Sequence, residues 1–185
     1  NNTMKKFFLL FAFVLCFSFA YAQDYEIVDG CITKEKIFEN TGLSADDTYQ
    51  RMTIFFGSYF NNVTETCKVN TPTKLLYKFI DDVANVNKGL GVYHTYYAEY
   101  ELQISIKDNR MRMVLTAYNI DSNDMIHSYA GYNPADTYPV IESHSSWETG
   151  VSKKQAETIF NGLMSSMSSI ERAIEKNLYE KVEEE

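Results

Sequence analysis

The sequence predicts an α+β domain, in which an antiparallel sheet of about five to seven strands packs against an N-terminal helix and a long C-terminal helix. Three observations predict it. Residues 96–119 alternate between apolar and polar side chains around a central turn, residues 44–59 read as a capped amphipathic helix, and residues 153–179 carry a sustained apolar stripe. Residues 23–179 form one domain, since no repeat and no linker interrupts them.

The domain begins with a strand followed by a helix. After the lead-in at residues 23–30, residues 31–38 (CITKEKIF) alternate well enough for a first strand, which Asn40-Thr41-Gly42 ends. Ser44-Ala45-Asp46-Asp47 has the spacing of a capping box, and the helix that it opens runs to about Tyr59. Its apolar face predicts core packing. That face consists of Tyr49, Met52, Phe56, Tyr59 and Phe60.

The next segment is less regular. Residues 63–69 (VTETCKV) are rich in β-branched side chains, which predicts a strand that Pro72 ends. Residues 75–86 fit either a short helix or a strand followed by a turn. We favour a strand over 75–80 and a turn at Asp81-Asp82, and Lys88-Gly89-Leu90-Gly91 marks a further bend.

The hairpin at residues 96–119 is the clearest β signal. Apolar side chains occupy every second position before and after Asp108-Asn109, two residue types that tolerate the positive φ of a tight turn. Its two strands therefore bury one face and leave the other in water. The buried set is Tyr96, Ala98, Tyr100, Leu102, Ile104, Ile106, Met111, Met113, Leu115 and Ala117.

Residues 120–151 predict a long polar loop with short strands at 125–129 and 140–144. Ser152-Lys153-Lys154-Gln155 is a second capping box, and the helix behind it covers about 153–179. Gly162 lies inside this helix at a cost of about 1 kcal/mol in propensity, which is tolerated where a neighbour approaches closely. Residues 180–185 form an acidic tail.

Residues 4–22 have the three parts of a secretory signal peptide. Lys5 and Lys6 precede a Phe-rich apolar run, and Ala20-Tyr21-Ala22 places small residues before a cleavage point between Ala22 and Gln23. We therefore expect residues 1–22 to be a signal peptide with upstream residues. The mature chain is expected to be exported to the periplasm, the outer envelope or the exterior of a bacterium, with no stable membrane span after cleavage.

The charge of the chain argues against nucleic-acid binding. The full chain has a net charge of −8, and without Lys5 and Lys6 the mature chain has 15 basic residues against 25 acidic ones, a net charge of −10. Such a balance gives no support to nucleic-acid binding, which needs clustered Lys and Arg.

The cysteines and histidines of the sequence do not predict a metal site or a catalytic site. In an oxidising compartment Cys31 and Cys67 could form a disulfide, and the alternative is two buried thiols. His94, His127 and His144 are far apart and fit no metal-binding spacing, so no cofactor and no metal is expected. We also find no nucleophile elbow, and hence expect no catalytic residue.

The aromatic side chains are the one feature of the sequence that points to a binding site. The mature chain has 13 Tyr, six Phe and Trp147, and Tyr suits half-buried surfaces and ligand walls because its ring is apolar and its tip polar. We take Tyr100, Tyr118, Tyr132 and Trp147 as candidate ligand-binding residues, although core packing and loop anchoring explain the same residues.

The chain resembles an exported bacterial family of unknown function that has a TATA-binding-protein-like (TBP-like) fold. The resemblance rests on the capped helix at 44–60, on Lys88-Gly89-Leu90-Gly91 before a strand, and on residues 107–112 (KDNRMR), and it covers about residues 30–175. It implies no activity and no catalytic residues. A helix-grip fold fits the same order of elements and would offer a ligand cavity.

Two functions follow as hypotheses. The first is an exported, non-catalytic domain that binds a small ligand or an envelope protein. The second is a secreted hydrolase whose site would be assembled in space from His127 or His144 beside a carboxylate or nucleophile.

Overall fold

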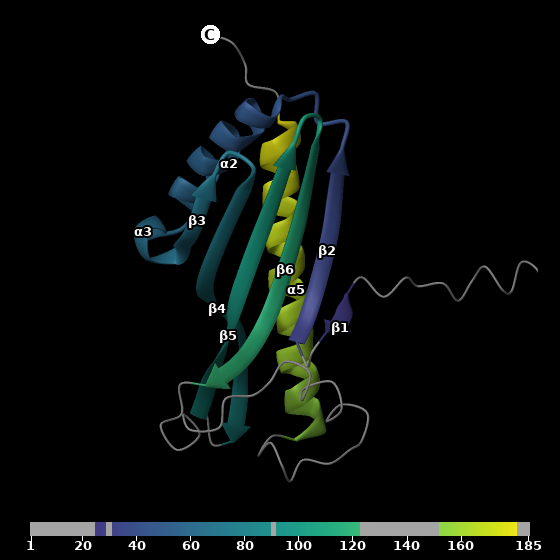
Figure 1. The fold of residues 1–185 in the computed structure, drawn as a ribbon. Helices are drawn as coiled ribbons and strands as arrows, with labels where there is room; N and C mark the ends of the chain where they lie inside the picture. Colours follow the sequence, from purple (N-terminus) through teal and green to yellow (C-terminus); the bar gives the residue numbers. More distant parts are fainter. Residues whose placement is uncertain (1–24, 29–30, 90–91, 123–151, 181–185) are drawn as a thin grey trace, which may run out of the picture.

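A six-stranded antiparallel sheet carries one long helix and one shorter helix on the same face (Figure 1). The computed structural model describes residues 25–28, 31–89, 92–122 and 152–180. The strand order is β1-β2-β6-β5-β4-β3. In chain order the elements are β1 (Glu26–Val28), β2 (Cys31–Glu39), α2 (Ala45–Tyr59), α3 (Val63–Thr66), β3 (Cys67–Thr71), β4 (Lys74–Gly89), β5 (Val92–Lys107), β6 (Arg110–Ser122) and α5 (Lys153–Tyr179).

The predicted hairpin is formed by β5 and β6, which lie at the centre of the sheet. All ten side chains expected on its apolar face are buried, and their alternation with wetter neighbours follows the period of two. Asn109 takes the turn with a φ of 56°, a left-handed conformation that Asn tolerates. We call the face that α5 covers the helix face and the opposite one the open face, because no described helix lies on it.

The helix α5 crosses the helix face from the far end of β4 to the end of β2 (Figure 1). Both halves of the predicted capping box are present, since Ser152 Oγ accepts from Gln155 N–H and the Gln155 side chain accepts from Ser152 N–H. At Gly162 the backbone of α5 lies close to that of β4. A Cβ built at Gly162 would lie 1.9 Å from the carbonyl oxygen of Val83, which explains why a glycine stands there.

The helix α2 begins at the predicted cap and is tied to the β5–β6 turn. Ser44 Oγ accepts from Asp47 N–H at 3.1 Å, but the Asp47 carboxylate binds the Ser44 hydroxyl instead of its N–H. The side chains of Asp108 and Asn109 accept from the N–H groups of Ala45 and Gly42, each at 2.8 Å. The hairpin turn thus fixes where the helix starts.

The irregular segment differs from the prediction in three places. Residues 63–66 form the short helix α3, so that β3 begins only at Cys67. Residues 74–89 are one long strand, and the expected turn at Asp81-Asp82 is instead a bulge between Asp82 and Ala84, which lets β4 bend without ending. The lead-in contains β1. The predicted signal peptide, the short strands at 125–129 and 140–144 and residues 181–185 lie outside the described residues.

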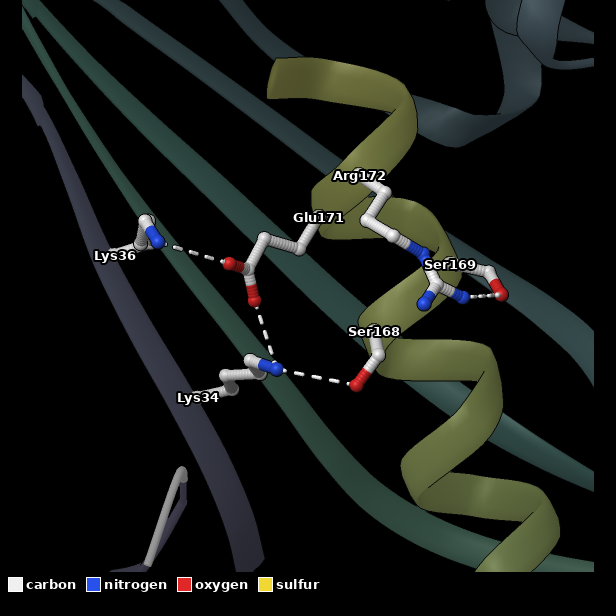
Figure 2. Close-up of polar contacts among 6 residues, drawn as sticks. All are labelled: Lys34, Lys36, Ser168, Ser169, Glu171 and Arg172. Atoms are coloured by element: carbon white, nitrogen blue, oxygen red, sulfur yellow. Dashed lines mark hydrogen bonds and ion pairs between the residues drawn. The ribbon is translucent and has the colours of Figure 1, made fainter. Parts of the chain in front are cut away.

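A buried ion pair joins β2 to α5 (Figure 2). Lys34 Nζ lies 2.7 Å from Glu171 Oε2 and donates to Ser168 Oγ at 3.2 Å, with only 2% of the lysine exposed. Lys36 Nζ reaches Glu171 Oε1 at 3.2 Å from the margin of the cluster, where 41% of its side chain is exposed. A lysine therefore occupies a core-facing position of β2, which costs desolvation unless its charge is paired.

On the open face, Arg112 holds Glu35 through two hydrogen bonds of 2.7 Å each. These bonds and the arginine's charge hold the pKa of Glu35 below its ordinary value. A depressed folded-state pKa means that the pair stabilises the fold above the unfolded-state pKa, and that this contribution is lost as the pH falls through the folded-state pKa.

We expect carboxyl NMR titration to give Glu35 a midpoint below the ordinary value, and Arg112→Gln to raise it. Arg110→Gln is the matched control, because Arg110 lies 3.7 Å from a different carboxylate, that of Glu39. Equal Glu35 midpoints in the wild type and in Arg112→Gln would show that the pair has no effect on the titration.

Candidate functional site

A surface cleft lies where α2 ends, α3 follows and the first half of β4 passes beneath them. Its volume is about 530 Å³. We call it the α3–β4 cleft. Its lining residues are Tyr59, Phe60, Asn61, Asn62, Glu65, Thr66, Lys78, Phe79, Ile80 and Asp81.

The cleft exists because β3 is much shorter than β4. β3 pairs with β4 only over Lys74–Tyr77, with a register shift between Cys67 and Val69, and before Cys67 the chain leaves the sheet as α3. The short strand has five residues and the long one sixteen. β4 therefore runs on past Tyr77 with a hollow beside it.

An aromatic cluster forms one wall of the cleft. The ring centroids of Phe60 and Phe79 are 4.9 Å apart, and Tyr59 meets Phe60 edge-on at 5.2 Å. Phe79 in turn stacks on Tyr100 at 5.2 Å. Because Tyr100 is fully buried, this wall is anchored in the core and its surface shape is fixed before anything binds.

Polar groups lie beside the aromatic wall of the cleft. Asp81 Oδ2 accepts from Ser166 Oγ of α5 at 3.0 Å, and Asp81 Oδ1 accepts from Asp82 N–H at 3.0 Å. The pKa of Tyr59 is raised, first by burial and then by the negative charge of Asp81. Tyr59 is thus held as a neutral hydroxyl that can donate or accept a hydrogen bond.

The open face carries a second polar group around Tyr118. Lys78 Nζ lies 3.0 Å from Glu101 Oε2 and 5.7 Å from the centre of the Tyr118 ring, while Asn119 donates to Glu99 at 3.2 Å. Burial and a hydrogen bond to Glu99 raise the pKa of Tyr118 to about 12. These groups satisfy one another, and of them Lys78 also lines the α3–β4 cleft.

Another cleft, of about 510 Å³, lies between α2 and the end of α5. Its central side chain is Arg51, which donates to the carbonyl oxygens of Asn177, Leu178 and Glu180 at 3.3, 3.1 and 2.7 Å. The guanidinium is therefore used to close the C-terminus of α5, a structural role.

Two of the four predicted ligand-binding residues, Tyr100 and Tyr118, do not lie in one site. Tyr100 is buried on the helix face and Tyr118 is half-buried on the open face, so the sheet separates them. Tyr100 contributes to the cleft only by supporting Phe79 from behind. Tyr132 and Trp147 lie outside the described residues.

Sequence reasoning missed Tyr59, Phe60 and Phe79 as site residues. Tyr59 and Phe60 followed the helical period and were assigned to the core, and Phe60 is indeed buried. The signal that could have identified the site is the run of aromatic side chains at the last turn of α2, one of which, Tyr59, is 40% exposed.

The possible disulfide between Cys31 and Cys67 does not form in this structure. Cys31 lies on β2 and Cys67 on β3, with β6, β5 and β4 between them in the sheet. Four strand spacings correspond to about 19 Å, whereas a disulfide needs Cα atoms within about 7 Å. No sulfur bond can join the two residues in this fold.

The described residues offer no assembled metal site, since none of them form a group of three or more His, Cys, Asp or Glu placed to hold an ion. His127 and His144, which the hydrolase hypothesis requires, lie outside the described residues. Within the ranges that the structure describes, no helix is long and apolar enough to cross a membrane.

Comparison with known proteins supports the fold. No protein-family model and no curated protein matches the sequence. Among solved structures, a DUF4468 family protein from Bacteroides ovatus ATCC 8483 is similar, with a TM-score of 0.64 and 9% identity over 89% of this chain and 95% of the other. A TBP-like protein from Parabacteroides distasonis ATCC 8503 has a TM-score of 0.57 and 10% identity over 81% and 96%.

Both similar structures are bacterial, and they confirm the α+β, TBP-like fold. At 9% and 10% identity they bear on the fold alone. The helix-grip alternative is not needed, because fully buried side chains occupy the space between the helices and the sheet where such a fold would hold a ligand. These include Phe38, Phe56, Tyr77, Tyr96 and Tyr100.

Proposed function

We propose that this chain is an exported, non-catalytic binding module that recognises a protein of the bacterial envelope at the α3–β4 cleft. The observation that carries the proposal is the preformed aromatic wall of Tyr59, Phe60 and Phe79 at the surface, edged by Asp81 and Glu65. Binding sites combine an apolar wall with a few polar groups that fix orientation, and aromatic residues are enriched in them.

A protein partner fits this site better than an enclosed small molecule. The interior of the fold is filled by buried side chains, and the cleft lies at the surface along a strand. Export is supported by the signal-peptide pattern of residues 4–22, with cleavage between Ala22 and Gln23.

Photo-crosslinking in living bacteria tests the proposal. A photoreactive phenylalanine analogue at position 59 or 80 is expected to give the same discrete adduct, since Tyr59 and Ile80 lie on two sides of one cleft. The matched control is position 93, where Tyr93 is 62% exposed at the far end of β5. An identical adduct pattern at all three positions, or no adduct at 59 and 80, contradicts the proposal.

The same cells report on export. We expect the adduct in the periplasmic or envelope fraction, with a mature chain that begins at Gln23. A chain that keeps residues 4–22 and stays in the cytoplasm would contradict the exported part of the proposal while leaving the crosslinking result to decide the cleft.

A further inference from the structure

Part of one edge of β4 has no neighbouring strand in the described structure. β3 covers Lys74–Tyr77, and over residues 78–82 no described strand lies on that side. A strand edge presents a row of backbone N–H and C=O groups that can pair with another extended chain. Proteins usually shield such edges, and here the edge carries Ile80 with 63% of its surface exposed.

The hollow beside this edge has the position that a longer β3 would occupy. The α3–β4 cleft is bounded by residues 78–81 of β4 on one side, and on the other by Asn62, which caps α3, and by Glu65 and Thr66 of α3. Four strand residues span about 13 Å, and an added strand would lie about 4.8 Å from β4. The space between α3 and β4 therefore has room for one extended segment, and we call this space the track.

Alternating side chains of such a segment would meet two different surfaces. Phe79 and Asp81 lie on the helix face, as shown by the stacking of Phe79 on Tyr100 and the bond of Asp81 to Ser166. Lys78 pairs with Glu101 on the open face, which Ile80 shares because it lies two residues further on. One side chain would thus pack against the aromatic wall, and its two neighbours would lie along Lys78 and Ile80.

The charges beside the cleft determine which charged residues are favoured in the bound segment. Lys78 is neutralised by Glu101 and Asp81 is held by a neutral serine. The carboxylate of Glu65 forms no ion pair among the described residues, and the nearby ammonium of Lys68 donates to the backbone carbonyl of Glu65 instead. The remaining negative charge favours Lys or Arg. A second copy of this acidic chain would bring like charges together, which disfavours pairing of β4 with itself.

We propose that the α3–β4 cleft binds an extended peptide segment of the partner by strand addition to β4, and that the segment carries an apolar or aromatic residue flanked by Lys or Arg. This inference rests on the proposed function for the location of the site, and adds the mode of binding and the chemical class of the partner. Backbone pairing supplies affinity, and the aromatic wall and the acidic rim supply specificity.

The test uses a synthetic heptapeptide, acetyl-Lys-Thr-Val-Phe-Val-Thr-Lys-amide, with the mature chain. We expect binding to slow the hydrogen exchange of the edge-facing amides within residues 78–82. An analogue with N-methyl groups on alternate residues should bind about tenfold more weakly, because it loses two or more backbone hydrogen bonds. Replacing both lysines by aspartate should weaken binding by a similar factor, and Glu65→Lys should remove that preference.

Matched variants separate the two proposals. Tyr59→Ala should weaken peptide binding, and Tyr93→Ala should not. Equal binding of the N-methylated peptide overturns strand addition but leaves the cleft as the recognition site, and equal effects of Tyr59→Ala and Tyr93→Ala overturn the site itself. Absence of binding, or protection of residues 78–82 by self-association of the free chain, also overturns strand addition.

Discussion

Replacing Gly162 by alanine is expected to destabilise the protein by about 2–3 kcal/mol, although alanine is the better helix former. The new methyl carbon would lie 1.9 Å from the carbonyl oxygen of Val83 and 2.8 Å from its carbonyl carbon. Both are backbone atoms of β4 and cannot turn aside as a side chain can. α5 would have to move away from the sheet and loosen the contacts on either side of residue 162.

Gly57→Ala is the matched control. Gly57 also lies inside a helix, but a Cβ there meets nothing within 4 Å. This change should stabilise the protein by about 1 kcal/mol. Urea unfolding monitored by circular dichroism measures both, provided that the two variants share one m-value. Effects of the same sign at the two positions would show that the close approach of α5 to Val83 carries no energy.

Removing one partner of the Lys34–Glu171 pair is expected to cost about 3–5 kcal/mol. In Glu171→Ala the ammonium of Lys34, which is 2% exposed, would keep Ser168 but lose its carboxylate. Lys36 loses the same carboxylate at little cost, because 41% of its side chain is already exposed. The buried lysine therefore accounts for nearly all of the effect.

The double variant Lys34→Met with Glu171→Leu should recover most of that loss, since apolar side chains of similar volume need no charge pairing. Lys36→Met serves as the surface control and should change the free energy of unfolding by less than about 1 kcal/mol. Equilibrium unfolding of the four proteins completes the comparison. A double variant as unstable as Glu171→Ala would mean that the charges themselves stabilise the fold.

Local patterns predicted the regular parts of this fold well. The alternation around Asp108-Asn109 gave the hairpin and its buried face, and two serine caps gave the starts of α2 and α5. Period and cap are properties of neighbouring residues, which is why they can be read from the chain. Lys34 interrupts the same kind of pattern, and its partner Glu171 lies on a distant helix that no local window includes.

The α3–β4 cleft could not be predicted in the same way. It results from the different lengths of β3 and β4, which depend on how the strands pair. Phe79 has the composition of a core residue and becomes part of a surface wall only because no strand covers the edge beside it. The aromatic count could not locate a site, because Tyr100 and Tyr118 lie on opposite faces of the sheet.

The position of β2 in the sheet has a consequence for how the chain acquires its structure. β2 is made early, but its inner neighbour is β6, and residues 32–39 must wait for residues 110–117 before that ladder can close. Contacts so distant in sequence raise the contact order and slow folding. If the chain is threaded through a membrane from its N-terminus, as the proposed export requires, β2 would therefore stay unpaired on that side until the central hairpin has emerged.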